Sequence, residues 1–210
     1  MSHYFSENAA LEDEEIQIPY RFHGRDFLFF SNSGVFSKNH IDLASDLLLE
    51  TFHRDMEKLK AEDLATYRLL SSGEALDMGC GYGVLGIVGK RLYPGTTWTF
   101  ADVNERALAL TTKNLQENGV YGARVVKSQG FASLDQSYSL IISNPPIRIG
   151  KEALYSIFSE MKEHLVPGGR VYLVIGKKQG AKSAQDFLGT VFQNLEVLEK
   201  KKGFYILVCS

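Results

Sequence analysis

Apolar and polar residues alternate in two short stretches of the chain, one before and one after His23-Gly24. Alternation with a period of two is typical of strands that bury one face, and a glycine between two such stretches favours a tight turn. Residues 16–31 are therefore predicted to form a β-hairpin.

Helical spacing replaces this alternation further along the chain, where apolar side chains recur at Ile41, Ala44, Leu48 and Phe52. Asn39, with Asp42 three residues later, resembles the capping pattern at the start of a helix. A second helical stretch is expected to end at Ser71-Ser72-Gly73. Residues 1–70 are accordingly interpreted as an N-terminal extension made of a hairpin and helices.

From residue 74 onwards, stretches typical of buried strands alternate with amphipathic stretches. The predicted strands cover 74–79, 97–103, 123–128, 138–143, 170–176, 195–200 and 204–210. The predicted helices cover 84–92, 104–118, 151–165 and 180–192. Such alternation is typical of a parallel sheet covered on both faces, and the short turn before the last strand makes that strand antiparallel. The predicted fold class is α/β, a doubly wound, mostly parallel, seven-stranded sheet with an antiparallel C-terminal strand over residues 71–210.

Composition narrows the classes of protein that this chain can represent. Its 210 residues are 44% hydrophobic and 23% charged, which suits a domain with a buried core and argues against wholesale disorder. No apolar run is long enough to cross a membrane, and the acidic first twenty residues do not resemble a signal peptide. The two cysteines and five histidines match no metal-ligand spacing. We therefore expect a cytoplasmic protein that uses neither a membrane nor a metal.

The charges are distributed unevenly along the chain. Residues 1–64 carry 13 acidic and 6 basic side chains, whereas residues 123–210 carry 12 basic and 7 acidic ones. This asymmetry is compatible with a polyanion meeting one face of the molecule, but Lys200-Lys201-Lys202 also fits a solvated strand end. Charge alone leaves both alternatives open.

The first candidate site lies where the strand at 74–79 meets the next helix, in the run Asp77-Met78-Gly79-Cys80-Gly81-Tyr82-Gly83. Glycines allow a sharp turn and a close approach of backbone N–H groups to a ligand, and a helix start favours a negative group. Gly81-x-Gly83-x-x-Gly86 alone also matches a dinucleotide fingerprint, so a nicotinamide-dependent oxidoreductase is an alternative. Against that alternative, no Tyr-x-x-x-Lys or similar hydride-transfer pattern follows.

A second candidate position is Asp102, at the end of the strand at 97–103. A carboxylate there can accept hydrogen bonds from two ribose hydroxyls, and its charge strengthens both. Asn104 can cap the following helix, which leaves Asp102 free for a ligand.

The third candidate is the run Asn144-Pro145-Pro146-Ile147, directly after the strand at 138–143. The prolines favour an extended, stiff backbone at this exit. The Asn144 carboxamide and the adjacent carbonyl can both accept hydrogen bonds from one amino group, which would orient a planar exocyclic amine towards an electrophile.

Ligands of doubly wound sheets bind beyond the carboxyl ends of the strands, where the strand order reverses. If the strands at 74–79 and 138–143 flank that reversal, the glycine-rich run and the Asn144 run face one crevice. A cofactor site and an amine clamp would then lie side by side.

Together, the Asp-x-Gly-x-Gly-x-Gly run, the acidic end of the second strand and the Asn-Pro-Pro-x run resemble class I S-adenosylmethionine-dependent methyltransferases. The stretch Gly34-Val35-Phe36-Ser37 with Asp42 is similar to the methyltransferase small domain family, which includes ribosomal RNA guanine-N2 methyltransferases. The resemblance extends from about residue 20 onwards. It implies a Rossmann-like methyltransferase fold, S-adenosyl-L-methionine as cofactor and S-adenosyl-L-homocysteine as product.

The resemblance also implies a role for each matching position. The methionine part of the cofactor would contact the glycine-rich run, at Asp77, Gly79, Cys80, Gly81 and Gly83. Asp102 would bind the ribose and Val103 would border the adenine, whereas Phe36 and Ser37 would cover the cofactor. The catalytic positions would be Asn144, Pro145, Pro146 and Ile147.

Two positions depart from the family pattern. Gln129 follows the third strand, where the class often has an acidic residue. With Gly130 and Phe131 it remains a candidate for the cofactor site, since its amide oxygen can accept from the adenine amino group. Ile147 stands where an aromatic residue commonly follows Asn-Pro-Pro, and an aliphatic side chain lacks the ring geometry of stacking.

The resemblance implies an N-methyltransferase for the exocyclic N2 amine of guanine in ribosomal RNA, with that RNA or a ribosomal particle as partner. We expect no counterpart of the second domain of two-domain members, so RNA selection would come from residues 1–70, a dimer partner or the basic C-terminal face. Candidate phosphate contacts are Arg148, Lys151, Lys177, Lys178 and Lys182. The alternatives are a protein glutamine amide or small-molecule amine as acceptor, and a catalytically silent binding module.

Overall fold

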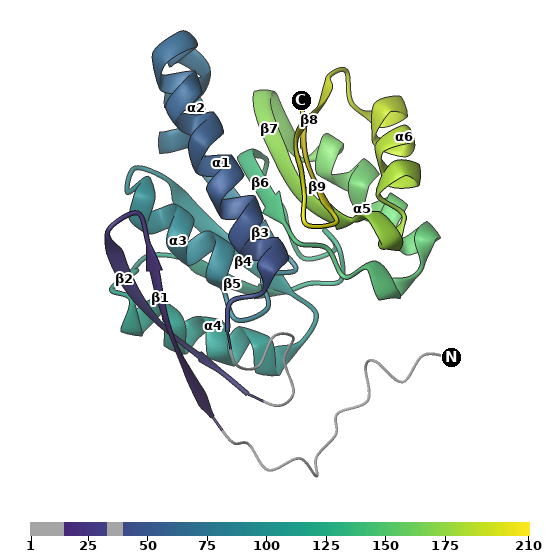
Figure 1. The fold of residues 1–210 in the computed structure, drawn as a ribbon. Helices are drawn as coiled ribbons and strands as arrows, with labels where there is room; N and C mark the ends of the chain where they lie inside the picture. The colour runs from purple at the N-terminus through teal and green to yellow at the C-terminus, as the bar shows by residue number, and fades with distance from the viewer. Residues whose placement is uncertain (1–14, 33–39) are drawn as a thin grey trace.

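A seven-stranded sheet, in the order β5-β4-β3-β6-β7-β9-β8, forms the centre of the computed structural model, which describes residues 15–32 and 40–210 (Figure 1). Among these seven strands, β9 alone runs antiparallel to both of its neighbours. The predicted mostly parallel sheet with an antiparallel C-terminal strand is therefore confirmed. The strands are β3 (Glu74–Met78), β4 (Thr97–Asp102), β5 (Arg124–Lys127), β6 (Tyr138–Ser143), β7 (Leu165–Gly176), β8 (Leu195–Lys201) and β9 (Phe204–Cys209).

Helices cover both faces of the sheet, so the fold is doubly wound as predicted. One face carries α1 (Leu43–Glu62), α2 (Leu64–Ser72), α3 (Val84–Leu92) and α4 (Glu105–Glu117). The other face carries α5 (Lys151–Glu163) and α6 (Ala181–Val191). Short 3₁₀ turns, η2 (Ile147–Ile149) and η3 (Lys177–Gln179), follow β6 and β7.

The predicted hairpin is present as β1 (Ile16–Phe22) and β2 (Arg25–Ser31), which turn at His23-Gly24. The helix after it begins later than predicted. Asp42 is its N-cap, with a carboxylate that accepts hydrogen bonds from the N–H groups of Ala44 and Ser45. The expectation of a cap at Asn39 with Asp42 inside the helix is therefore wrong, and Asn39 itself lies outside the described residues.

The start of β7 also differs from the prediction, which placed it at residue 170. β7 begins at Leu165, because this residue pairs with Tyr138 at the start of β6. The register then shifts before Leu140 pairs with Arg170, so the intervening Pro167-Gly168-Gly169 bulges out of the ladder. These residues predict a loop, yet a bulge lets the strand continue through them.

The N-terminal helices share one core with the sheet. Phe52 of α1 is fully buried, and its ring centroid lies 5.0 Å from that of Tyr172 on β7. Asp55, one turn further along α1, accepts hydrogen bonds from Tyr172 and Arg170. The boundary predicted near residue 70 falls within α2, and the parts on either side of it pack together.

Two buried asparagines, Asn114 of α4 and its C-cap Asn118, bind the outer edge of β2 as a neighbouring strand would. Asn114 accepts from the N–H of Phe30 at 2.7 Å and donates to the carbonyl of Phe30 at 3.0 Å. Asn118, one turn later, makes the same pair of bonds with Leu28. Asn114 also donates to the carbonyl of Tyr82 at 2.8 Å, so one side chain joins the hairpin to the glycine-rich loop.

Replacing Asn114 with alanine is expected to lower the free energy of unfolding by about 3 kcal/mol, because three backbone groups lose their partner in a buried place. Urea unfolding of the ligand-free protein measures this loss. Gln116→Ala, on the exposed side of the same helix, is the matched control and should stay within about 0.5 kcal/mol of the wild type. Equal stability of the two variants would contradict the bridging role of Asn114.

Candidate active site

The strand order reverses between β3 and β6, which are hydrogen-bonded neighbours with Asp77 paired to Ile142. The Ser143 hydroxyl donates to the carbonyl of Met78 at 2.6 Å and so joins the carboxyl ends of these two strands. A Cβ built on Gly79 would lie 3.6 Å from Cδ of Pro146. The glycine-rich run and the Asn144 run therefore adjoin at the reversal point.

The glycine-rich loop follows a path that other residues rarely adopt. The φ angles of Gly79, Gly81 and Gly83 are +69°, +56° and +90°. A Cβ at Gly81 would meet no atom of the described residues within 4 Å, so the described part of the chain leaves one side of the loop open. Glycine here gives both the turn and the access that a bound molecule needs.

The N–H groups of this loop are used within the protein rather than held out for a ligand. Those of Gly79 and Cys80 both donate to the carbonyl of Ala101, and that of Gly83 donates to the carbonyl of Cys80. The N–H of Gly81 donates to the Asp102 carboxylate at 2.9 Å. All four donors thus have a partner within the protein, which fixes the loop to the end of β4 and to itself, and their approach to a ligand stays a prediction.

Asp77 is 1% exposed and holds the start of α3, since its Oδ2 accepts from the N–H of Gly86 at 2.8 Å. Its Oδ1 has no hydrogen-bond partner among the described residues. Burial raises the pKa of Asp77 to about 7, against the opposing effect of the Gly86 hydrogen bond. An unpaired carboxylate oxygen beside an open glycine loop is a place for a cationic or hydrogen-bond-donating group.

This raised pKa predicts how the stability of the ligand-free protein depends on pH. The folded state holds the Asp77 proton up to about pH 7, whereas the unfolded chain releases it near pH 4. The folded state thus binds more protons across this window, and stability falls as pH rises through it, by at most about 4 kcal/mol. Thermal unfolding between pH 4 and 8 measures the fall. Asp77→Asn should make the curve flatter, and an unchanged slope would contradict the assignment.

Gly86 allows α3 to pack closely on β4. A Cβ at this position would lie 2.4 Å from the Phe100 ring, so only glycine lets α3 approach β4 this closely. Gly86, in the first turn of α3, thus brings the helix onto the sheet beneath the loop, as in other α/β nucleotide folds.

Asp102 is half-buried at the end of β4, and the neighbouring Asn104 caps α4, as predicted, by accepting from the N–H of Arg106. Asp102 is not free, however. Its Oδ1 accepts from the N–H of Asn104 and its Oδ2 from that of Gly81. Each carboxylate oxygen can accept more than one hydrogen bond, so room for two hydroxyl donors remains. Val103, next to it, is 38% exposed and offers an apolar surface at the same edge.

Asn144 is held by the first turn of α1. Its Nδ2 donates to Asp42 Oδ1 at 3.3 Å and to Ser45 Oγ at 3.1 Å. Oδ1 accepts no hydrogen bond from the described residues, so the amide is fixed with its acceptor unused. Pro145 behind it is buried and Pro146 is exposed, which makes this a rigid exit from β6.

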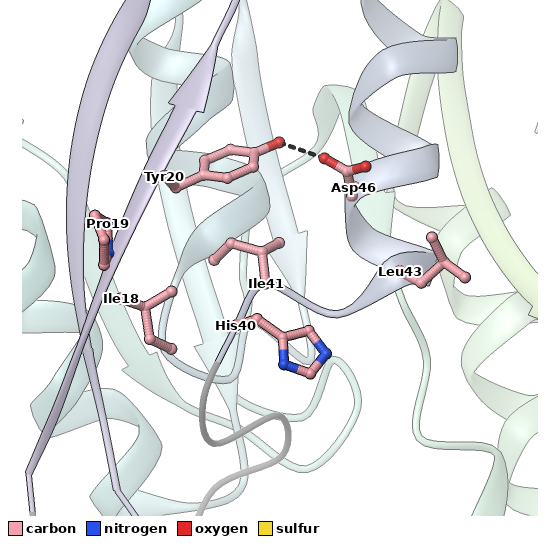
Figure 2. A pocket seen from close by; sticks show the side chains of 7 residues that line it. All are labelled: Ile18, Pro19, Tyr20, His40, Ile41, Leu43 and Asp46. Carbon is pink, nitrogen blue, oxygen red and sulfur yellow. Dashed lines mark hydrogen bonds between the residues drawn. The ribbon is translucent and has the colours of Figure 1, made fainter.

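A hollow of about 550 Å³ lies between β1 and the first turn of α1 (Figure 2). Ile41 and Leu43, which precede and follow the N-cap Asp42, both line it. Tyr20 and Asp46 reach towards each other across it and form a hydrogen bond of 2.8 Å. Burial raises the pKa of Tyr20 well above its usual value, so its hydroxyl remains a donor. The lining residues are Ile18, Pro19, Tyr20, His40, Ile41, Leu43 and Asp46.

The other predicted site residues differ in exposure and in what they contact. Gln129 is exposed after β5, whereas the Phe131 ring is buried and stacks on His164 at 4.6 Å. The backbone at Gly130 lies against α5, where a Cβ would come within 3.2 Å of Glu160. Ile147 is half-buried in η2 and packs against the core under α5. Phe36 and Ser37 lie outside the described residues, so their covering role stays a prediction.

The thiol of Cys80 does not face the open side of the loop. Its Sγ lies 3.7 Å from Thr111 Oγ1, and burial raises its pKa well above the usual value. Thr111 donates to the carbonyl of Gly81 at 2.8 Å and so supports the loop from α4. Sequence reasoning missed Thr111, Ser143 and Ser45, because each acts on a residue far away in the chain. Of the three, Ser143 could have been considered from the sequence, because it directly precedes Asn144.

Metal sites and membrane-spanning helices were both searched for among residues 15–32 and 40–210. Among the described residues, no group of three or more His, Cys, Asp and Glu side chains is placed to hold a metal ion. No helix in that part of the chain combines the length and apolar character needed to cross a bilayer.

A doubly wound sheet that joins a glycine-rich loop, a carboxylate-ended strand and an Asn-Pro-Pro exit at its reversal point defines the class of Rossmann-like methyltransferases. The model of the methyltransferase small domain family matches residues 26–208. The chain belongs to this family and is an S-adenosylmethionine-dependent methyltransferase. The match also decides against the oxidoreductase alternative for the glycine run.

Two relatives illustrate the likeness in sequence. The YbxB protein of Bacillus subtilis, which carries no functional name, is 38% identical over 98% of this chain and 96% of its own length. Ribosomal RNA small subunit methyltransferase C of Pasteurella multocida is 37% identical over 71% of this chain, but over only 42% of its own length. The chain thus spans less than half of that named methyltransferase.

Solved structures extend the likeness in fold. The 16S rRNA N2 methyltransferase of T. thermophilus, in complex with AdoMet and guanosine, superposes with a TM-score of 0.78. The match covers 92% of this chain and 50% of that protein, at 22% sequence identity.

The residues of the reversal point fit the cofactor of this class. The buried, unpaired Oδ1 of Asp77 suits the ammonium group of the methionine part. The open side at Gly81 admits a ligand, and Asp102 retains acceptor capacity for ribose hydroxyls beside exposed Val103. Each of these contacts is a proposal that the cofactor's chemistry supports.

Proposed function

We propose that this protein methylates the exocyclic N2 amine of a guanine in ribosomal RNA. The observation that carries the proposal is the fixed Asn144 amide, whose Nδ2 is bound by Asp42 and Ser45 while Oδ1 has no partner within residues 15–32 and 40–210. An amine donates hydrogen bonds, and an immobilised acceptor is what would orient it. The names of the relatives support RNA as the class of acceptor.

S-adenosylmethionine, when bound, supplies a methyl group activated by a sulfonium. The chain's own residues then position the acceptor: Asn144 Oδ1 and the Pro145 carbonyl would accept from the amine and hold its nitrogen towards the glycine loop. The nitrogen would form a bond to the methyl carbon as the bond between that carbon and sulfur breaks, which leaves S-adenosylhomocysteine, and it would lose a proton to solvent. Positioning of this kind converts an encounter into an effectively unimolecular step.

The hollow beside α1 supports a planar acceptor. The ring of Tyr20 and the aliphatic side chains of Ile41 and Leu43 offer faces for a base, and Asp46 offers a carboxylate for its N–H edge. Since Ile41 and Leu43 flank Asp42, a base in this hollow would lie next to the Asn144 amide. A base within a folded RNA must be extruded to reach such a place.

The experiment is nucleoside mass spectrometry of ribosomal RNA from cells with and without the gene for this protein. We expect one methylguanosine to disappear on deletion and to return with the wild-type gene. An unchanged set of methylated nucleosides would overturn the proposal. In a cell extract, label from methyl-tritiated cofactor that resists nuclease but not protease would instead favour a protein amide as the acceptor.

A further inference from the structure

Several lysines of the C-terminal half come together at the carboxyl edge of the sheet, although they are separate in the chain. Gly176, the last residue of β7, pairs with Phe204, the first residue of β9. The N–H of Lys177 donates to the carbonyl of Gly203 at 2.7 Å. The end of β7 and the β8–β9 turn thus lie side by side (Figure 1). We call their four lysines the lysine edge: Lys177, Lys178, Lys201 and Lys202.

The lysine edge is exposed, and none of its four ammonium groups forms an ion pair with a described residue. Other basic groups nearby are already engaged: Lys182 pairs with Asp186, Lys151 lies over the Tyr155 ring, and Arg54 pairs with Glu199. Like charges held together repel one another unless an anion lies between them. The edge is therefore suited to an anion that does not come from the described protein.

A cleft of about 200 Å³ between α1 and the β8–β9 turn adds a second observation. Lys201 and Lys202 line it together with Thr51, whose buried hydroxyl has no partner among the described residues. The carboxylates that also line the cleft each bind a side chain of the protein. The pairs are Asp46 with Tyr20, Glu50 with His23, and Glu199 with Arg54.

The lysine edge also lies close to the amine clamp. Ser143 pairs with Leu173 on β7, so Lys177 is only about 10 Å further along the neighbouring strand than Asn144. On the helix side, Asp42 and Ser45 hold Asn144, and the adjacent Leu43 and Asp46 open the cleft. The start of α6, where Gly180 makes no side-chain cap, presents a positive helix end to the same edge.

We propose that the lysine edge binds the sugar–phosphate backbone of the acceptor RNA next to the extruded nucleotide. This inference rests on the proposed function, because it takes RNA as the acceptor. A phosphate chain supplies closely spaced anions that match four lysines without an ion pair to residues 15–32 or 40–210, and such contacts set position while leaving the choice of base to other groups.

Three double variants, each removing two charges, test this. Two are in the edge: Lys177→Gln with Lys178→Gln, and Lys201→Gln with Lys202→Asn, asparagine being tolerated at the positive φ of residue 202. The control is Lys58→Gln with Lys60→Gln, exposed lysines near the far end of α1. The probe is deproteinised bacterial 16S ribosomal RNA, with the dissociation constant measured between 50 and 300 mM salt.

Each edge variant is expected to reduce the slope of log affinity against log salt by about 1.5 and to weaken binding about tenfold, because two phosphate contacts are lost. The control should keep the wild-type slope, and all three should bind S-adenosylmethionine like the wild type. Equal slopes for edge and control variants, or no salt-dependent binding by the wild type, would overturn the inference. Failure of the proposed function is distinct, since it appears as unchanged methylated nucleosides in the deletion strain.

Discussion

Asn144→Ala is expected to lower kcat for methyl transfer by about 10²- to 10³-fold while leaving the Kd for S-adenosylmethionine within about twofold. The amide is held by two hydrogen bonds through Nδ2, so its unused oxygen is the feature that alanine removes. Among the described residues this side chain is bound by Asp42 and Ser45 and not by the glycine loop or Asp102, so the loop and Asp102 should bind the donor as before. Single-turnover methylation of the RNA identified by mass spectrometry, together with calorimetric binding of the donor, measures both quantities.

Ser45→Ala is the matched control for this prediction, because it keeps the amide and removes one of its anchors. Ser45 lies in the first turn of α1, and the cap at Asp42 remains intact. A smaller loss, about tenfold in kcat, is expected if the anchor restricts the amide rather than touching the acceptor. Normal turnover of Asn144→Ala would remove the clamp from the mechanism. Loss of donor affinity would instead assign Asn144 to the cofactor site.

The fold could be predicted from the sequence because its elements repeat at clear periods and are separated by glycines and caps. The seven strands and the glycine-rich turn depend on local patterns. Local patterns do not determine which strands flank the reversal point, and the structure has β3 and β6 there. The start of β7 escaped prediction, since a strand that passes through Pro167-Gly168-Gly169 depends on its pairing partner in β6. The N-cap of α1 was predicted at the wrong residue, because Asn39 and Asp42 lie three residues apart and both are types that commonly cap a helix.

In the candidate site, local motifs predict which residues matter, whereas contacts between distant residues determine how these are held. Motifs located Asp77, Asp102 and Asn144 at three strand ends, and the structure brings those ends to one edge of the sheet. The bonds that fix them join residues far apart in the chain: Ser143 reaches Met78, and Asn144 reaches Ser45. No spacing rule predicts such pairs from one sequence. The N–H groups of Gly79 and Cys80 likewise depend on the carbonyl of Ala101, in the next strand.

Asp102→Ala is expected to raise the Kd for S-adenosylmethionine by about 100-fold, because two hydrogen bonds from ribose hydroxyls to a charged carboxylate would be lost. Asp102 also accepts from the N–H of Gly81, so the variant changes the glycine loop as well as the ligand contact. Calorimetric titration with the donor measures the total loss. Asp135→Ala, on the exposed side of the sheet edge, controls for the change in net charge.

A second ligand separates the two effects of Asp102. An S-adenosylhomocysteine analogue without the ribose hydroxyls should bind the wild type about 30- to 100-fold more weakly than the parent compound. If Asp102 contacts those hydroxyls, Asp102→Ala should bind the analogue and the parent with nearly equal affinity, because the same interaction cannot be lost twice. If Asp102 acts only through Gly81, the two losses should instead add. Additive losses would leave Asp102 as a support of the glycine loop and would require another acceptor for the ribose.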